Sequence, residues 1–252
     1  MKFYEFGAEG SPVILCMHGM MQSWESIYKV VKPLEENYRL LIPAMDGFYE
    51  GCDNFTSFSD QAEQLEKYVI EHYNGKIDGV YALSQGALLI IEVLTRNKIS
   101  IAAAVLDGTY AAHQGWIAGW VTYRMLRAFK NDPEHPPKLI RCMLFMMGID
   151  KEHADASFAK LRSQLYLKAS DESIRRNCLE NYTYHVRSQL SCTKTEVYLW
   201  CGEKEKYAIK SHEIVKKHIT PKGEEILCGL GHGELAARCP EQLQEKLREV
   251  FG

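Results

Sequence analysis

Short apolar runs that alternate with helical patterns restrict the fold of this chain more than any other feature. The runs "PVILCMH" (12–18), "IDGVYAL" (77–83) and "IAAAVLD" (101–107) are mainly apolar, as expected for strands covered on both faces of a mostly parallel sheet. Between them, apolar residues recur at helical spacing from about Ser23 and again from Ser57. This strand–helix–strand–helix order predicts a doubly wound α/β sheet.

The sheet pattern has further members and one long interruption. Other predicted strands are residues 2–6, "YRLLIPAM" (38–45), "TEVYLWCG" (195–202) and "EEILCG" (224–229). After Tyr110 the pattern stops, and aromatic and Met-rich helical stretches surround the breaker "NDPEHPPK" with no convincing strand. We therefore predict a core domain of residues 1–110 and 191–252 and a helical insertion of residues 111–190.

The length and charge of the chain argue against several classes of protein. Its 252 residues suit one large domain, and a net charge of −3 with dispersed Lys and Arg residues disfavours nucleic-acid binding. Apolar runs fall short of the roughly 18 residues that span a bilayer, and the N-terminus lacks a secretory pattern. We predict a cytoplasmic protein without a transmembrane segment. The eight cysteines include no Cys-x-x-Cys pair, which predicts reduced, mostly buried thiols and no metal site.

One hydroxyl interrupts the apolar stretch "VYALSQGALL", where a predicted strand meets a predicted helix. A sharp strand-to-helix turn that projects a nucleophile needs small residues two positions before and after it, as in Gly-x-Ser-x-Gly. Ala82 and Gly86 meet this requirement around Ser84, although alanine replaces the first glycine. From this stretch alone, a buried serine that caps the helix N-terminus is an equally good interpretation.

Two glycine-containing turns supply further candidates. The turn in "CMHGMMQSW" ends a buried strand, which makes the main-chain N–H groups of Met20 and Gln85 candidate donors of an oxyanion hole. We expect His18 to hold this turn by hydrogen bonds and to take no part in chemistry. In "GLGHGE", His232 follows the last predicted strand and is the candidate general base for Ser84. The alternative is a solvent-exposed loop histidine.

A carboxylate that orients His232 is expected after the strand "TEVYLWCG". Glu205 is the first choice, Glu203 the second, and Asp107, at the end of the strand "IAAAVLD", the third. For an isolated glutamate, a solvated loop charge is the alternative. Ser84, Glu205 and His232 occur in the order nucleophile, acid, histidine, and each lies just past the carboxyl end of a predicted strand.

On these residues the sequence resembles the α/β-hydrolase family. "HGMM" is similar to the family's oxyanion turn, "ALSQG" to its nucleophile elbow, "GEKE" to its acid loop and "GLGH" to its histidine loop. The resemblance implies a mostly parallel sheet of about eight strands, a helical cap inserted after strand 6, and a serine hydrolase that needs no cofactor and no metal. Ala82 in the elbow and glutamate in place of the commoner aspartate are departures from the family pattern.

By the same resemblance, residues 111–190 form the cap, whose apolar side chains contribute to a substrate pocket. The candidate pocket residues are Met21 in the core and Trp116, Trp120, Tyr123 and Met146 in the insertion. Most aromatic and Met-rich positions of helices are expected to pack in the core. Further candidate walls with this character are Met125, Leu126, Phe129, Met143 and Phe145.

The predicted activity is hydrolysis of a small to medium, largely apolar carboxylic ester through a Ser–His–Glu triad and an acyl-enzyme. Thioesterase, amidase, carbon–carbon bond hydrolase and cofactor-free haloperoxidase activities remain open, because one fold hosts many reactions. A ligand-binding or receptor-like protein is a further class, which tight binding without turnover would distinguish. These patterns do not predict an oligomeric state.

Overall fold

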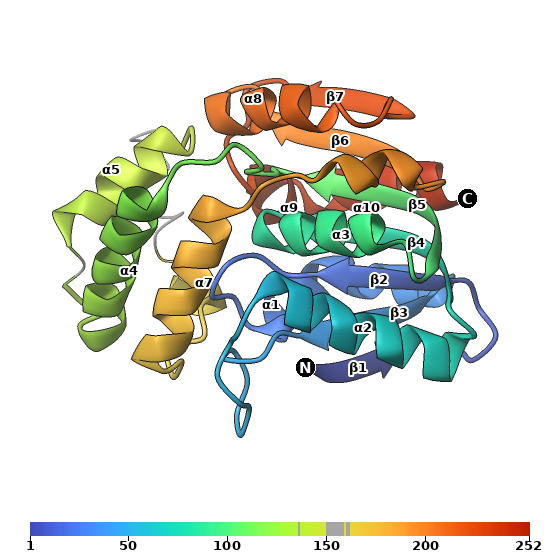
Figure 1. The fold of residues 1–252 in the computed structure, drawn as a ribbon, viewed down its shortest axis with the longest axis horizontal. Helices are drawn as coiled ribbons and strands as arrows, with labels where there is room; N and C mark the ends of the chain where they lie inside the picture. The colour runs from blue at the N-terminus through green and yellow to red at the C-terminus, as the bar shows by residue number, and fades with distance from the viewer. Residues whose placement is uncertain (136, 150–158, 160–161) are drawn as a thin grey trace.

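The computed structural model describes residues 1–135, 137–149, 159 and 162–252 (Figure 1). The described residues form a seven-stranded sheet in the order β1-β3-β2-β4-β5-β6-β7, parallel except for β1. The strands are β1 (Lys2–Phe6), β2 (Val13–Met17), β3 (Arg39–Ala44), β4 (Lys76–Leu83), β5 (Ser100–Asp107), β6 (Glu196–Gly202) and β7 (Gly223–Leu227). This is one strand fewer than expected, because β1 pairs directly with β3 and forms the sheet edge in the described part of the chain.

Helices occupy most of the connections between the strands. They are α1 (Trp24–Val31), α2 (Phe58–Tyr73), α3 (Gln85–Arg96), α4 (Trp116–Asn131), α5 (Lys138–Met146), α7 (Asp171–Thr183), α8 (Lys206–Val215), α9 (Glu234–Arg238) and α10 (Pro240–Phe251), with short 3-10 helices η1 (Lys32–Glu36) and η2 (Ser188–Cys192). Among the described residues, no helix is both long enough and apolar enough to cross a membrane.

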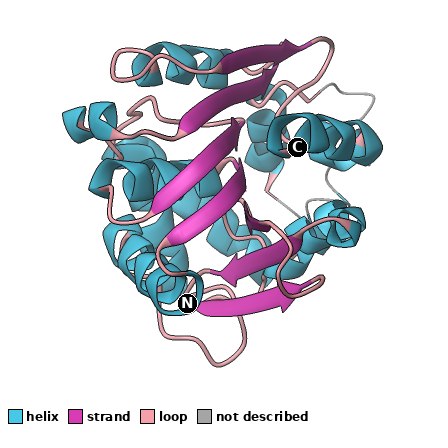
Figure 2. Ribbon diagram, turned by 90° about the vertical axis from the view of Figure 1, so that its right-hand side faces the viewer, coloured by secondary structure: helices cyan, strands magenta, loops and turns pink. Residues whose placement is uncertain are grey.

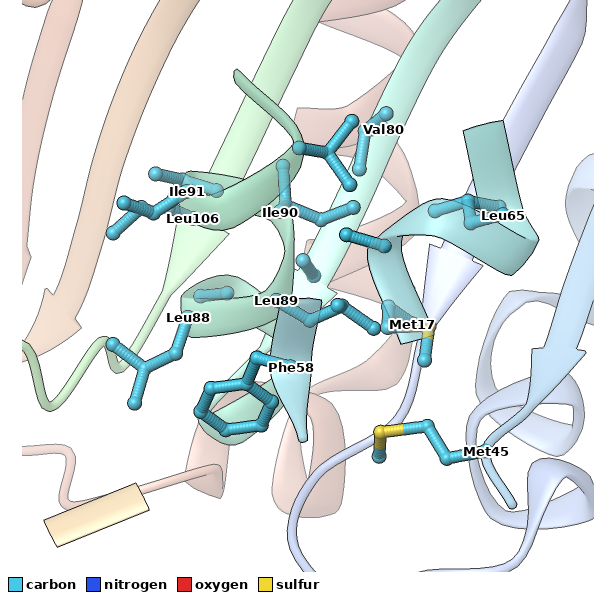
Figure 3. Packing of buried hydrophobic residues seen from close by; sticks show 14 of the residues in the cluster. Met17, Met45, Phe58, Leu65, Val80, Leu88, Leu89, Ile90, Ile91 and Leu106 are labelled. Carbon is cyan, nitrogen blue, oxygen red and sulfur yellow. The ribbon is translucent and has the colours of Figure 1, made fainter. Parts of the chain in front are cut away.

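The sheet is covered on both faces, which explains its nearly continuous apolar strands. In β2, Leu15 and Met17 belong to the cluster that includes side chains of α2 and α3, whereas Ile14 and Cys16 belong to the cluster that includes α1 and α10. Figure 2 shows the twisted sheet with helices on both sides, and Figure 3 shows how the strand side chains of the first cluster interdigitate with those of α2 and α3.

Local signals set the ends of two helices. The Ser57 hydroxyl accepts a hydrogen bond of 3.1 Å from the N–H of Asp60, which caps α2 at its N-terminus. At the other end of α2, Asn74 adopts the left-handed conformation with φ 52°. Pro240 occupies the first turn of α10, and Leu243 and Leu247 form its buried face.

The helical insertion leaves the sheet after β5 and returns to it before β6. Helices α4, α5 and α7 lie together at one end of the sheet, beyond the carboxyl ends of the parallel strands (Figure 1). The insertion thus follows the strand "IAAAVLD", expected as strand 6, which is the fifth strand here because the described sheet has one strand fewer than expected. Part of the predicted insertion, residues 136, 150–158 and 160–161, lies outside the described residues.

The cysteines differ from the prediction. All eight are free thiols, but only Cys16, Cys178 and Cys201 are buried, while Cys142, Cys192 and Cys228 are exposed. The prediction of mostly buried thiols is therefore wrong. An apolar run does not show which of its positions face outward, and on α5 it is Ile140 and Leu144 that fill the buried side.

Candidate active site

Ser84 occupies a strained turn between β4 and α3. Its backbone has φ 57° and ψ −117°, a conformation that a non-glycine residue adopts only when the surroundings enforce it. The Ser84 N–H donates a hydrogen bond of 2.7 Å to the carbonyl of Asp107. A Cβ atom on Gly86 would lie 2.7 Å from the carbonyl oxygen of His18, so this position requires glycine.

The hydroxyl of Ser84 does not cap the helix that it precedes. It makes no capping hydrogen bond, and its Oγ lies 2.8 Å from Nε2 of His232. The helix-cap interpretation of this serine is therefore not supported, and the geometry is that of a nucleophile beside a base.

His232 lies between the serine and a buried carboxylate. Its Nδ1 is 2.6 Å from Oε2 of Glu205, which is 1% exposed. The other oxygen of Glu205 accepts a hydrogen bond of 2.7 Å from the N–H of Gly202. A Cβ atom on Gly108 would lie 2.9 Å from the imidazole and 3.2 Å from the carboxylate. The glycine therefore leaves room for a Ser–His–Glu hydrogen-bonded chain.

The two other candidate carboxylates do not contact His232. Glu203 is exposed and accepts a hydrogen bond of 2.9 Å from the N–H of Gly229, a bond that lowers the pKa of its carboxyl. Asp107 is buried and accepts a hydrogen bond of 2.9 Å from the hydroxyl of Tyr81. Burial and the nearby charge of Glu205 raise the pKa of Asp107 to about 7. Of the three predicted candidates, Glu205 is the one that the fold brings to the histidine.

The predicted oxyanion turn lies directly beside the serine. A Cβ atom on Gly19 would be 3.5 Å from Cβ of Ser84. Among the described residues, the main-chain N–H groups of Met20 and Gln85 donate to no protein acceptor. Gln85 is the first residue of α3, where N–H groups have no partner within the helix and the helix dipole favours negative charge. These two N–H groups therefore remain the candidate oxyanion donors.

His18 holds this turn in place. It is fully buried, its Nδ1 lies 3.0 Å from the carbonyl of Gly19, and its Nε2 accepts a hydrogen bond of 3.4 Å from the N–H of Met45. Burial lowers the pKa of His18 to about 4, so the imidazole stays neutral. These contacts agree with the structural role that the sequence predicted.

A cavity of about 370 Å³ opens above Ser84 and His232, and its walls are mainly apolar. Core elements and the helical insertion both contribute to it. The lining side chains of the insertion include Leu126, Met143, Leu144, Met146, Met147, Ile149, Leu165 and Tyr182. Two tyrosines line the cavity from the core. Tyr110 lies three residues beyond the end of β5, and Tyr207 lies two residues beyond Glu205.

Only part of the pocket prediction agrees with this lining. Met146 lines the cavity, but Met21 is fully buried outside it, and Trp116, Trp120 and Tyr123 do not reach it. Trp116 and Trp120 are 66% and 46% exposed. The prediction fails because the opposite side of α4, with buried Thr122, Met125, Leu126 and Phe129, faces the rest of the protein.

Several lining residues were missed by sequence reasoning. Tyr110 and Tyr207 had a usable signal, since both closely follow a strand or loop that carries a candidate site residue. Leu144 had none, because the packing of α5 decides which of its faces is covered, and Met147 and Ile149 had none, because their place at the cavity depends on the turn after α5. The His232 N–H donates a hydrogen bond of 2.9 Å to the carbonyl of Met147, which draws this turn toward the site.

Solved structures with the same architecture are numerous. A protein of Desulfitobacterium hafniense, described as an alpha/beta hydrolase family protein, has 22% sequence identity and a TM-score of 0.87 over 100% of both chains. An esterase from Exiguobacterium antarcticum has 16% identity and a TM-score of 0.77, covering 99% of this chain and 94% of its own. A thermophilic esterase from Thermogutta terrifontis has 17% identity and a TM-score of 0.73, covering 100% and 94%.

No family model matches this chain, and no curated protein sequence matches it. At 22% identity or less, similarity to solved structures establishes architecture and not activity. The sheet order, the elbow at Ser84 and the similarity along the whole chain agree with one another. The chain therefore has the α/β-hydrolase fold.

Proposed function

We propose that this protein is a serine hydrolase that cleaves carboxylic esters of small to medium, largely apolar molecules. The observation that carries the proposal is the continuous chain from Ser84 Oγ through His232 to Glu205, with distances of 2.8 Å and 2.6 Å, at the wall of an apolar cavity. The esterases among the structurally similar proteins add support. Residues 111–190 serve as the cap that supplies one wall of this cavity.

In the proposed mechanism, Ser84 Oγ attacks the ester carbonyl while His232 Nε2 takes the hydroxyl proton. Glu205 accepts a hydrogen bond from Nδ1–H and stabilises the imidazolium that forms. The N–H groups of Met20 and Gln85 bind the oxyanion of the tetrahedral intermediate. His232 then protonates the leaving alcohol, and water hydrolyses the acyl-enzyme by the same proton transfers in reverse order.

A fluorophosphonate probe and a panel of p-nitrophenyl esters test this proposal. We expect the probe to label wild-type protein and not Ser84→Ala, and we expect this variant to lose about a thousandfold or more of the ester turnover. Equal labelling of both proteins would show that Ser84 is not the nucleophile. A thioester and an amide of the same acyl group, assayed beside the ester, separate esterase from thioesterase and amidase activity.

Labelling without turnover of any substrate in the panel would favour a binding protein that keeps a reactive serine. Direct titration with the same uncleaved esters would then show binding in the absence of hydrolysis. We expect turnover, because Ser84 and His232 line the cavity and the hydrogen-bonded chain continues from His232 to Glu205.

A further inference from the structure

The cap segment around Gln164 is joined directly to the turn that carries the oxyanion donor Met20. The N–H of Ser23 donates a hydrogen bond of 2.9 Å to the carbonyl of Gln164, and the N–H of Tyr166 donates one of 2.7 Å to the carbonyl of Met21. Gln22 and Leu165 are paired between these two bonds as an isolated antiparallel bridge. The connection links parts of the chain more than 140 residues apart.

The side chain of Gln22 reinforces this turn from inside. Its Oε1 accepts a hydrogen bond of 2.9 Å from the N–H of Gly19, and its main-chain N–H donates one of 3.2 Å to the Gly19 carbonyl. Its Nε2 donates a hydrogen bond of 3.4 Å to Oε1 of Gln164. One side chain therefore closes the turn on itself and ties it to the cap segment.

The turn needs such support because its backbone is strained. Met21 adopts φ 56°, which costs a non-glycine residue about 1 kcal/mol or more. The direction of the Met20 N–H depends on the peptide plane between Gly19 and Met20. The Gly19 carbonyl lies in this same plane and accepts the main-chain N–H of Gln22 at 3.2 Å. The Gln22 side chain holds the preceding peptide plane through the N–H of Gly19, so Gln22 restrains the planes on both sides of the Gly19 α-carbon and limits rotation of the Met20 N–H.

We propose that Gln22 is a positioning residue that holds the Met20 N–H toward the oxyanion, and that its contact with Gln164 couples this donor to the cap. The inference rests on the proposed function of the site. Gln22 and Gln164 also line the cavity. A substrate that packs against the cap segment therefore lies next to the hydrogen bond between these two side chains, which orients the Met20 N–H. The cap thereby contributes to catalysis as well as to recognition.

Two variants test the coupling. Gln22→Met keeps the side-chain volume but removes the amide's hydrogen bonds with Gly19, Gln164 and Ser26. It should lower kcat about 10- to 100-fold while KM changes less than about threefold, since the lost interaction acts in the transition state. Gln164→Met removes only the side-chain link to the cap and leaves the main-chain bridge, so we expect a smaller loss of kcat, about three- to tenfold.

Gln244→Met is the matched control. Gln244 is buried and its side-chain amide donates a hydrogen bond of 2.7 Å to the carbonyl of Val30, but Gln244 does not line the cavity. This variant should lower stability without changing kcat or KM. If Gln22→Met behaves like Gln244→Met, the role of Gln22 is structural and the proposal is wrong.

Amide hydrogen exchange of residues 18–23 gives a readout that does not depend on turnover. We expect faster exchange in this segment for Gln22→Met and Gln164→Met than for wild type, and no change there for Gln244→Met. Unchanged exchange in the first two variants overturns the inference whatever the substrate is. By contrast, wild-type protein that neither reacts with the fluorophosphonate nor cleaves any ester overturns the proposed function.

Discussion

The loops at the carboxyl ends of the strands and the helices of the insertion build the same cavity in different ways. In the loops, Ser84, His232 and Glu205 are connected by hydrogen bonds of 2.8 Å and 2.6 Å, and Glu205 is 1% exposed. In the insertion, apolar side chains divide between the cavity and solvent, and Phe145 is 64% exposed although Leu144 beside it lines the cavity. The proposed chemistry thus depends on backbone turns, and the proposed recognition depends on which helix face is covered.

This contrast has a physical origin. A turn such as that at Ser84 needs a small residue where a Cβ atom would meet a main-chain oxygen, so its requirement is visible in the residues themselves. A helix places apolar residues on several faces, and only its packing partners decide which face is buried. The catalytic loops and the insertion should therefore respond differently to substitution.

The largest effect is expected at the acid. Glu205→Gln should lower kcat/KM about 100- to 10,000-fold, because an amide cannot stabilise the imidazolium. Glu203→Gln, which changes an exposed carboxylate without contact to His232, should remain within about twofold of wild type. Steady-state assays on one p-nitrophenyl ester compare them. A greater loss in Asp107→Asn than in Glu205→Gln would mean that the acid is wrongly assigned.

The turn at Ser84 can be tested through its neighbours. Gly86→Ala places a Cβ atom 2.7 Å from the carbonyl oxygen of His18, and we expect the free energy of unfolding to fall by about 2 kcal/mol and probe labelling to slow. Ala82→Gly adds no atoms and should cost about 1 kcal/mol or less. Denaturant titration measures the free energy of unfolding of both variants. Equal stability of Gly86→Ala and the wild type would show that the turn at Ser84 does not require glycine at position 86.

The apolar side chains with which the insertion lines the cavity should affect selectivity more than rate. Met143→Ala enlarges the cavity, so the ratio of kcat/KM for a hexanoyl over a butyryl ester should rise about tenfold. Trp120→Ala removes a larger side chain that is 46% exposed and outside the cavity, and the ratio should stay within about twofold. A larger shift with Trp120→Ala would show that the exposed face of α4 contacts substrate.

The last prediction concerns stability and the buried carboxyl that the proposed triad does not use. The pKa of Asp107 is raised from its ordinary value of 3.8 to about 7, so between these values the folded state keeps a proton that the unfolded state loses. Wild-type stability should therefore fall as pH rises through this window. Because asparagine cannot titrate, the free energy of unfolding of Asp107→Asn should rise relative to that of the wild type by about 1 kcal/mol for each pH unit within this window.

Denaturation of the wild type and Asp107→Asn across this pH range provides the measurement. The difference between the two free energies of unfolding should level off above pH of about 7, where Asp107 is ionised in both states. A difference that does not vary with pH would show that Asp107 titrates normally.

Much of the fold was predictable because its signals are local. The seven strand segments, the capping of α2 by Ser57 and the start of α10 at Pro240 all follow from residues close in sequence. The same holds for the elbow, where Ala82 and Gly86 flank Ser84. Exposure of Cys142 and of Trp116 was not predictable, since neighbouring elements decide which side of a helix faces solvent.

The sequence by itself determined the order of strands and helices and the residue types at the ends of β4, β6 and β7, because apolar periodicity and the need for small residues act over a few positions. Only the tertiary structure decided that Glu205 forms the hydrogen bond with His232, while Asp107 accepts one from Tyr81. It also decided which residues of the insertion line the cavity, and it joined Gln22 to Gln164. These outcomes depend on packing between segments far apart in the chain, and no local pattern records such packing.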